Sequence, residues 1–169
     1  MLLVALALGA ADPPRAGARQ WQTGSTSAWP LLRQHGDSLL YDAPVQRPTL
    51  PFTLELSAVN TGAPDSAWGI WLQTEAGQVK ILVSNEGYFS VSDDEQPLWQ
   101  QFIHLRPGTA NKLYLHYAAP DAPAVLRLND EIAWQGDLAP APSGRWGLLT
   151  FRQPQLSEQA ISLYYANET

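Results

Sequence analysis

The sequence predicts a single all-β domain, built as a two-sheet antiparallel jelly-roll sandwich. Apolar residues recur at every second position in several segments, which is typical of strands that bury one face. The chain of 169 residues contains 14 prolines and 12 glycines, which favour many turns and little helix. Short strands follow one another at regular spacing between turn residues, and this pattern indicates a sandwich or a barrel.

The first strands are expected at residues 38–42, 51–60 and 66–74. In the second of them apolar and polar residues alternate, so its apolar side chains share one face. In the third, Trp68 is in phase with the apolar residues two and four positions on, whereas Trp71 is out of phase with them. Trp68 is therefore expected in the core and Trp71 on the opposite side of the sheet.

A hairpin is expected at residues 78–92, with its turn at 85–87. Residues 112–118 alternate again and place Tyr114 and His116 on one face. Asn129-Asp130 is a strong two-residue turn, because both residues tolerate positive φ. The remaining strands are expected at 124–128, 131–134, 145–151 and 161–165. The residues expected in the core are Phe52, Leu54, Leu56, Trp68, Ile70, Leu113, Leu115, Leu148 and Leu163.

Residues 1–11 form an unbroken apolar run, MLLVALALGAA. A membrane-spanning helix needs about 20 residues, so this run fits the apolar part of a secretory signal, or an anchor. A buried amino-terminal strand is the alternative. Residues 12–20 are expected to be a Pro/Gly linker, and residues 21–169 the single β-sandwich domain. The domain is therefore expected to be extracytoplasmic: secreted, periplasmic or attached to a membrane on the outer side.

The charge and the cysteine content exclude several kinds of function. The net charge is −6, and the ten lysine and arginine residues are scattered singly. Phosphate contacts need clustered basic residues, so no nucleic-acid partner is expected. The chain has no cysteine, which excludes disulfides, thiolate metal sites and a cysteine nucleophile.

Seven short segments share a pattern of apolar residues and glycines with a known superfamily. They are FTLEL at 52–56, WGIWL at 68–72, GYF at 87–89, LYLH at 113–116, LRLNDE at 126–131, RWGL at 145–148 and ISLY at 161–164. The pattern resembles concanavalin A-like lectin/glucanase domains, and within them laminin-G-like and family-16-hydrolase-like modules. The resemblance implies two packed antiparallel sheets, one of them concave, and frequently a glycan or protein ligand on the concave side or rim.

The carboxylates do not follow the pattern of a glucanase. Retaining glucanases of this fold carry Glu-x-Asp-x-x-Glu on one strand, which points the carboxylates to one face. No strand here has that spacing, and Glu55 stands alone. Asp93, Asp94 and Glu95 are adjacent, so their side chains diverge; they are expected to be solvated turn residues, with a calcium site as the alternative. No other cofactor is expected.

The three histidines, His35, His104 and His116, fit neither a nucleophile triad nor a zinc site. No Gly-x-Ser-x-Gly motif is present, and His-x-His and His-x-x-x-His spacings are absent. Together with the missing carboxylate pair, this predicts that the protein is not an enzyme.

The aromatic residues are the only enriched chemistry, with seven tryptophans in the chain. Sugar rings stack on Trp and Tyr because their C–H groups meet the negative face of the π-system. The candidate ligand-binding residues are Trp71, Tyr114, His116 and Trp99. Core packing is the alternative for each Trp, and a half-exposed strand position the alternative for His116. The same side chains would also serve a protein interface.

Three functions remain open. The first is a non-catalytic recognition module that binds a glycan or a protein partner through an aromatic-bearing sheet face. The second is an accessory or structural subunit of a membrane-attached or extracellular complex, held by residues 1–11. The third is a divergent glycoside hydrolase, which needs two carboxylates facing one cleft.

Overall fold

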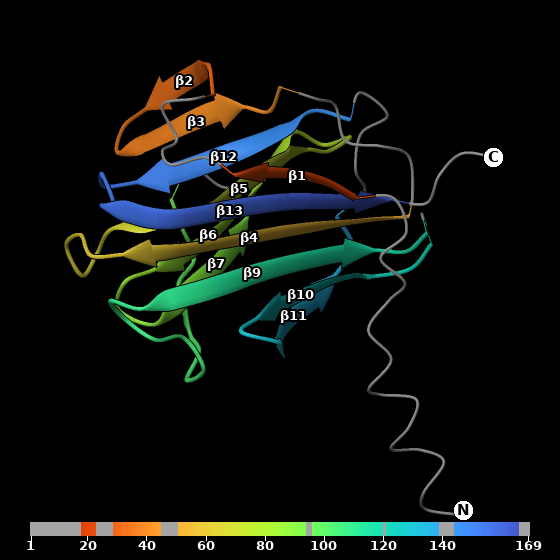
Figure 1. Cartoon of the computed structure of the whole chain (residues 1–169). Coiled ribbons are helices and arrows are strands. Elements are labelled where there is room, and N and C mark those ends of the chain that lie inside the picture. The colour runs from red at the N-terminus through yellow and green to blue at the C-terminus, as the bar shows by residue number, and fades with distance from the viewer. Residues whose placement is uncertain are drawn as a thin grey trace, which may run out of the picture.

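The protein is a two-sheet antiparallel sandwich, as the sequence predicts (Figure 1). The computed structural model describes residues 18–22, 29–44, 51–93, 96–119, 121–138 and 144–165. Within these ranges the chain forms thirteen strands and no helix. The described residues accordingly contain no helix that is long and apolar enough to span a membrane.

Each sheet draws its strands from both halves of the chain. In spatial order, the six-stranded sheet contains β1 (Ala18–Gln22), β13 (Leu156–Tyr165), β4 (Phe52–Asn60), β9 (Ala110–Tyr117), β10 (Ala124–Leu128) and β11 (Glu131–Gly136). The seven-stranded sheet contains β2 (Leu31–His35), β3 (Ser38–Asp42), β12 (Trp146–Phe151), β5 (Ala67–Gln73), β6 (Gln78–Ser84), β7 (Tyr88–Ser92) and β8 (Gln100–Gln101). In Figure 1, β13, β4 and β9 lie in front of β5, β6 and β7.

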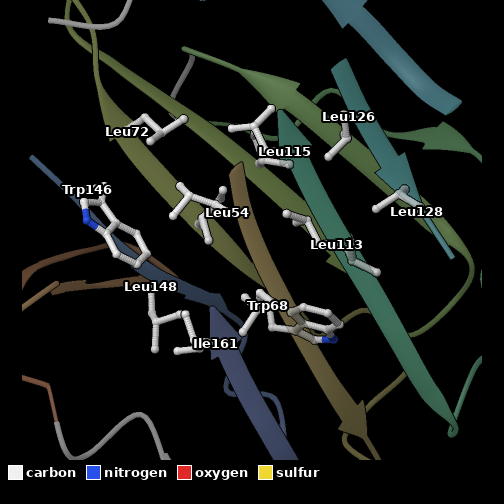
Figure 2. Packing of buried hydrophobic residues seen from close by; sticks show 14 of the residues in the cluster. Leu54, Trp68, Leu72, Leu113, Leu115, Leu126, Leu128, Trp146, Leu148 and Ile161 are labelled. Atoms are coloured by element: carbon white, nitrogen blue, oxygen red, sulfur yellow. The ribbon is translucent and has the colours of Figure 1, made fainter. Parts of the chain in front are cut away.

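The core lies between the two sheets and is built by the alternating residues. Leu54, Leu113 and Leu115 from one sheet face side chains of β5 and β12 from the other (Figure 2). All nine residues expected in the core are buried, so that prediction is confirmed. Full burial of such a side chain is worth roughly 1.5–3 kcal/mol, and a one-residue slip would expose a whole strand face.

Several elements extend beyond the predicted ones. Strand β1 begins at Ala18 and pairs with β13, so the predicted linker over residues 12–20 is wrong at its last three residues. Residues 1–17, including the apolar run, lie outside the described residues. Strands β2 and β8 were not predicted, and β2 pairs with β3 around Gly36, whose φ is +53°. Strand β13 begins at Leu156, ahead of the predicted start. A bulge before Ala160 interrupts the alternation of its residues, so the first part of the strand lacks the pattern on which the prediction depends.

A second buried cluster lies on the outer face of the seven-stranded sheet. In β5 and β12 the residues between the core positions are also buried. Their side chains alternate with Trp68, Ile70 and Leu148 and therefore point away from the core. The cluster contains Leu40, Ala67, Trp71, Leu82, Leu149 and Phe151. Both faces of this sheet are thus covered at its centre.

Candidate functional site

Trp71 belongs to the outer buried cluster and is not open to a ligand. The prediction that it faces away from Trp68 is confirmed, but its assignment as a ligand-binding residue is wrong, because it is 0% exposed. Its indole Nε1 donates a hydrogen bond to the Tyr41 carbonyl oxygen at 2.9 Å. The indole crosses β12 at Gly147, where a Cβ would lie 2.5 Å from Nε1. Trp71 therefore ties β5 to β3 over a strand that has no side chain at that point.

Tyr114 and His116 share a face of β9, as predicted, but they lie on the outer side of the six-stranded sheet. That side is opposite to the Trp71 cluster, so the four candidate residues do not form one surface. Tyr114 is buried, which contradicts its role as a ligand-binding residue.

His116 is half-buried beside β4. Its Nδ1 lies 2.9 Å from the Thr53 hydroxyl. Burial lowers the pKa of His116, and the charge of Arg127 lowers it further, while a hydrogen bond with the Phe52 backbone acts in the opposite direction. The contact with Thr53 joins β9 to β4, and the role of His116 as a ligand contact stays a prediction.

Trp99 lines a pocket of about 380 Å³ on the outer face of the seven-stranded sheet. This volume lies within the range of small-molecule sites. The pocket sits at the end of the sheet where β6 meets β7 and where β12 ends. Three aromatic residues line it, Tyr88, Trp99 and Phe151, and its polar lining is provided by Asp65, Ser84, Glu86, Gln96 and Arg152.

The aromatic side of the pocket, formed by Tyr88, Trp99 and Phe151, is held in place by contacts with the sheet. Trp99 packs edge-to-face on Phe151, with ring centroids 6.2 Å apart, yet it remains 38% exposed. Its segment is tethered to β7, because the Leu98 N–H donates to the Ser90 hydroxyl at 2.9 Å. Trp99 therefore presents a fixed, partly open ring to the pocket.

Arg152 lies beside the aromatic side of the pocket, between two carboxylates. Its Nη1 donates to Asp65 at 2.6 Å and its Nε donates to Asp37 at 3.2 Å. These hydrogen bonds, first with Asp65 and then with Asp37, raise the pKa of Arg152. The guanidinium carbon also lies 5.2 Å from the centroid of the Phe151 ring. The side chain is thereby fixed over the pocket as a hydrogen-bond donor.

The backbone at the end of β12 directs Arg152 to this place. Arg152 and Gln153 have φ of +52° and +49°, which non-glycine residues adopt rarely. The Arg152 N–H donates to the Asp37 carbonyl oxygen at 2.9 Å, so the turn is fixed to the hairpin that carries Asp37. Such strained residues concentrate at functional sites.

Asp65 is positioned by a buried asparagine. Asn60, at the end of β4, accepts a hydrogen bond from the Gly62 N–H at 2.9 Å and donates to the Ser66 hydroxyl at 3.1 Å. Asn85 donates to the Gly62 carbonyl oxygen at 2.9 Å. The loop between β4 and β5 is therefore held on both sides, and Asp65 with it.

Glu86 lies at the tip of the turn between β6 and β7. The Ser84 hydroxyl accepts hydrogen bonds from the backbone N–H groups of Glu86 and Tyr88, at 3.3 and 3.1 Å. The Glu86 side chain is exposed and forms no ion pair with the described residues. Asp65 and Glu86 are thus two carboxylates at one pocket, which no spacing within one strand could reveal.

The calcium hypothesis stays a prediction. Within the described ranges, no group of three or more acidic or histidine side chains is arranged to hold a metal ion. Asp93 is exposed just after β7, while Asp94 and Glu95 lie outside the described residues.

Comparisons with known proteins identify the fold. No protein-family model and no curated protein matches the sequence. Sheep galectin-11 in complex with glycerol superposes with a TM-score of 0.53 at 11% identity, over 77% of this chain and 99% of that one. The Caenorhabditis elegans galectin LEC-6 gives 0.51 at 13% identity, over 76% and 96%. The Crh5 transglycosylase in complex with NAG gives 0.56 at 9% identity, over 90% and 86%.

These likenesses confirm the concanavalin A-like jelly-roll fold that the sequence resembles. Lectins and an enzyme share it, so the fold by itself does not choose between binding and catalysis. That choice depends on the side chains of the pocket.

Proposed function

We propose that the protein is a non-catalytic, extracytoplasmic recognition module that binds a glycan in the pocket lined by Trp99. The observation that carries the proposal is the partly open Trp99 ring, fixed on Phe151 next to Arg152 and Glu86. A pyranose ring stacks its C–H face on an indole, while its hydroxyl groups need donors and acceptors at the edge of the ring. Arg152 supplies donors and Glu86 supplies acceptors.

The proposed location rests on the sequence of residues 1–11. Eleven consecutive residues without charge are unlike the mixed composition that follows them. A monomeric protein rarely exposes such a patch to water, so the run is either removed on export or covered. Intact-mass measurement of the native protein tests this, and a full-length, soluble cytoplasmic monomer would contradict it.

A divergent glycoside hydrolase is the second candidate, and it is favoured by Asp65 and Glu86 lining the same pocket. Glycosidases of either stereochemical class use two carboxyl groups with separate roles. Here Asp65 already accepts a hydrogen bond from the Arg152 guanidinium, which leaves Glu86 as the single carboxylate of the described lining without an ion pair. This arrangement supports binding over catalysis.

The binding test uses a glycan array followed by calorimetry on the ligands found. Trp99→Ala is expected to weaken binding by up to about tenfold, because aromatic stacking is worth roughly 0.5–1.5 kcal/mol and about 1.4 kcal/mol corresponds to a factor of ten in affinity. Trp99→Phe should retain much of the affinity. Ile132→Ala, at an exposed apolar residue of β11 in the other sheet, is the matched control and should bind like the wild-type protein.

Two outcomes would contradict non-catalytic glycan binding, and a third would contradict its location in this pocket. One is a folded wild-type protein that binds no glycan of the array. The other is release of reducing sugar from a glycan panel that Glu86→Gln abolishes, which would instead identify the hydrolase. A Trp99→Ala variant that binds as well as the wild type would move the site away from this pocket.

A further inference from the structure

The pocket carries more negative than positive charge. Its described lining contains the carboxylates of Asp65 and Glu86 and one cation, Arg152. A third carboxylate, that of Asp37, lies just outside the lining and is bonded to the same guanidinium at 3.2 Å. An arginine side chain commonly binds a carboxylate or sulfate group of a ligand. Whether Arg152 can do so depends on which of its N–H groups are already bonded within the protein.

Arg152 is already neutralised by its own chain. Asp65 and Asp37 occupy its Nη1 and Nε, where a ligand carboxylate or sulfate would otherwise form its charge-assisted bonds. A guanidinium has five N–H groups, so donors remain for ligand hydroxyls. Glu86, which has no such partner among the described residues, adds an unbalanced negative charge on the same wall.

We propose that this pocket selects uncharged glycans and rejects acidic ones, such as uronic, sialylated or sulfated sugars. The inference rests on the proposed function, because it names the ligand class of the same site. A neutral pyranose offers hydroxyl donors to Glu86 and acceptors to the remaining N–H groups of Arg152. An acidic sugar meets Glu86 as a like charge and must compete with Asp65 and Asp37 for the guanidinium.

The salt dependence of binding distinguishes electrostatic rejection of acidic glycans from a steric misfit of the same glycans. Exposed charges are screened over about 8 Å at physiological ionic strength, so repulsion between Glu86 and an acidic ligand weakens as salt rises. Affinity for a neutral glycan is therefore expected to change little between low and high salt. Affinity for its acidic counterpart is expected to rise with added salt. An acidic ligand held by Arg152 would show the opposite trend, with binding that falls as salt is added.

The experiment compares matched pairs of glycans that differ only in an acidic group. Suitable probes are glucose and glucuronate oligosaccharides, galactose and galacturonate oligosaccharides, and N-acetyllactosamine with and without sulfate. For the backbone that binds, we expect the neutral member to bind at least about tenfold more tightly. The double variant Asp37→Asn/Asp65→Asn frees the charge of Arg152 and should narrow that ratio several-fold by improving the affinity for the acidic member.

Asp42→Asn is the control for the loss of an ion-paired carboxylate outside the pocket. Asp42 is bonded to Arg145 at 3.1 Å, outside the pocket, so this variant should keep the neutral-to-acidic ratio of the wild type. If thermal melting shows that the double variant does not fold, Asp37→Asn alone is used, since Asp37 lies in an exposed hairpin turn.

Equal or tighter binding of the acidic members by the wild type overturns the inference and leaves glycan binding intact. A wild-type protein that binds neither member overturns the proposed function.

Discussion

The indole nitrogen of Trp71 in β5 is hydrogen-bonded to the carbonyl oxygen of Tyr41 in β3, across the intervening strand β12. The bond is possible because β12 has glycine at residue 147. Three strands of the seven-stranded sheet are thus joined by a side chain as well as by their backbone ladder. Trp71 belongs to the same outer cluster as Phe151, the residue on which Trp99 packs.

Gly147→Ala is expected to be among the most destabilising single substitutions in the chain. A Cβ at residue 147 would lie 1.7 Å from the Tyr41 carbonyl oxygen, which belongs to the backbone and cannot move aside. We expect a loss of at least about 3 kcal/mol in the free energy of unfolding, or no folded protein. Urea unfolding measures it. Gly36→Ala is the control: nothing lies near its Cβ, and its φ of +53° should cost only about 1–2 kcal/mol.

Trp71→Phe should reduce stability by about 1–3 kcal/mol, because the Tyr41 carbonyl oxygen loses its buried donor. Trp99→Ala should reduce it by less, since that side chain is partly exposed. Trp71→Phe is therefore expected to lose more stability than Trp99→Ala in urea unfolding. Trp99→Ala is expected to lose more glycan affinity than Trp71→Phe in calorimetry. A Trp71→Phe protein as stable as the wild type would show that the hydrogen bond contributes nothing net.

Asn60→Ala should weaken both stability and binding. The buried amide satisfies the Gly62 N–H and the Ser66 hydroxyl, and its loss is expected to cost about 1–3 kcal/mol. The loop that carries Asp65 would lose its position, so glycan affinity should fall even under conditions where the variant is fully folded. Unaltered affinity in the folded variant would show that Asp65 does not depend on this amide.

Lowering the pH should destabilise the fold through His116. Its pKa is lowered in the folded state by burial, so the unfolded chain binds the proton more readily. The contribution is complete above the ordinary pKa of about 6.5 and is lost progressively as the pH falls below it. Urea unfolding at a series of pH values should show a slope in this range that is smaller in His116→Gln. His104→Gln, at an exposed histidine, should keep the slope because His116 is still present.

The sandwich could be predicted from the sequence because one chemical pattern determines it. Alternation in β4 and β9 places Phe52, Leu54, Leu56, Leu113 and Leu115 on the core side, and the structure confirms that set. The alternation fails where a backbone irregularity intervenes, as in the bulge of β13 between Ser157 and Ala160. Strand β2 has no buried face, so periodicity gives no signal for it.

The site was harder to predict, because its side chains come together only in the folded chain. The sequence predicts Trp99 as a candidate ligand-binding residue, but it gives no signal for the neighbours of Trp99 in the pocket, Tyr88, Phe151 and Arg152. A signal did exist for the covered face: β5 and β12 read as nearly continuous apolar runs, which is typical of strands buried on both sides. That signal indicates that Trp71 is buried and therefore cannot contact a ligand.

Residues 96–99 are joined to the sheet by the hydrogen bond from the Leu98 N–H to Ser90 and by the contact of the Trp99 ring with Phe151. The framework beneath them is far less tolerant, as Gly147 and Trp71 show. Different residues therefore determine the two properties: residues 96–99 affect ligand preference, whereas Gly147 and Trp71 affect folding. Variation among residues 96–99 would retune recognition while leaving the scaffold intact, which makes this short segment the natural place to diversify in a library of binders built on this protein.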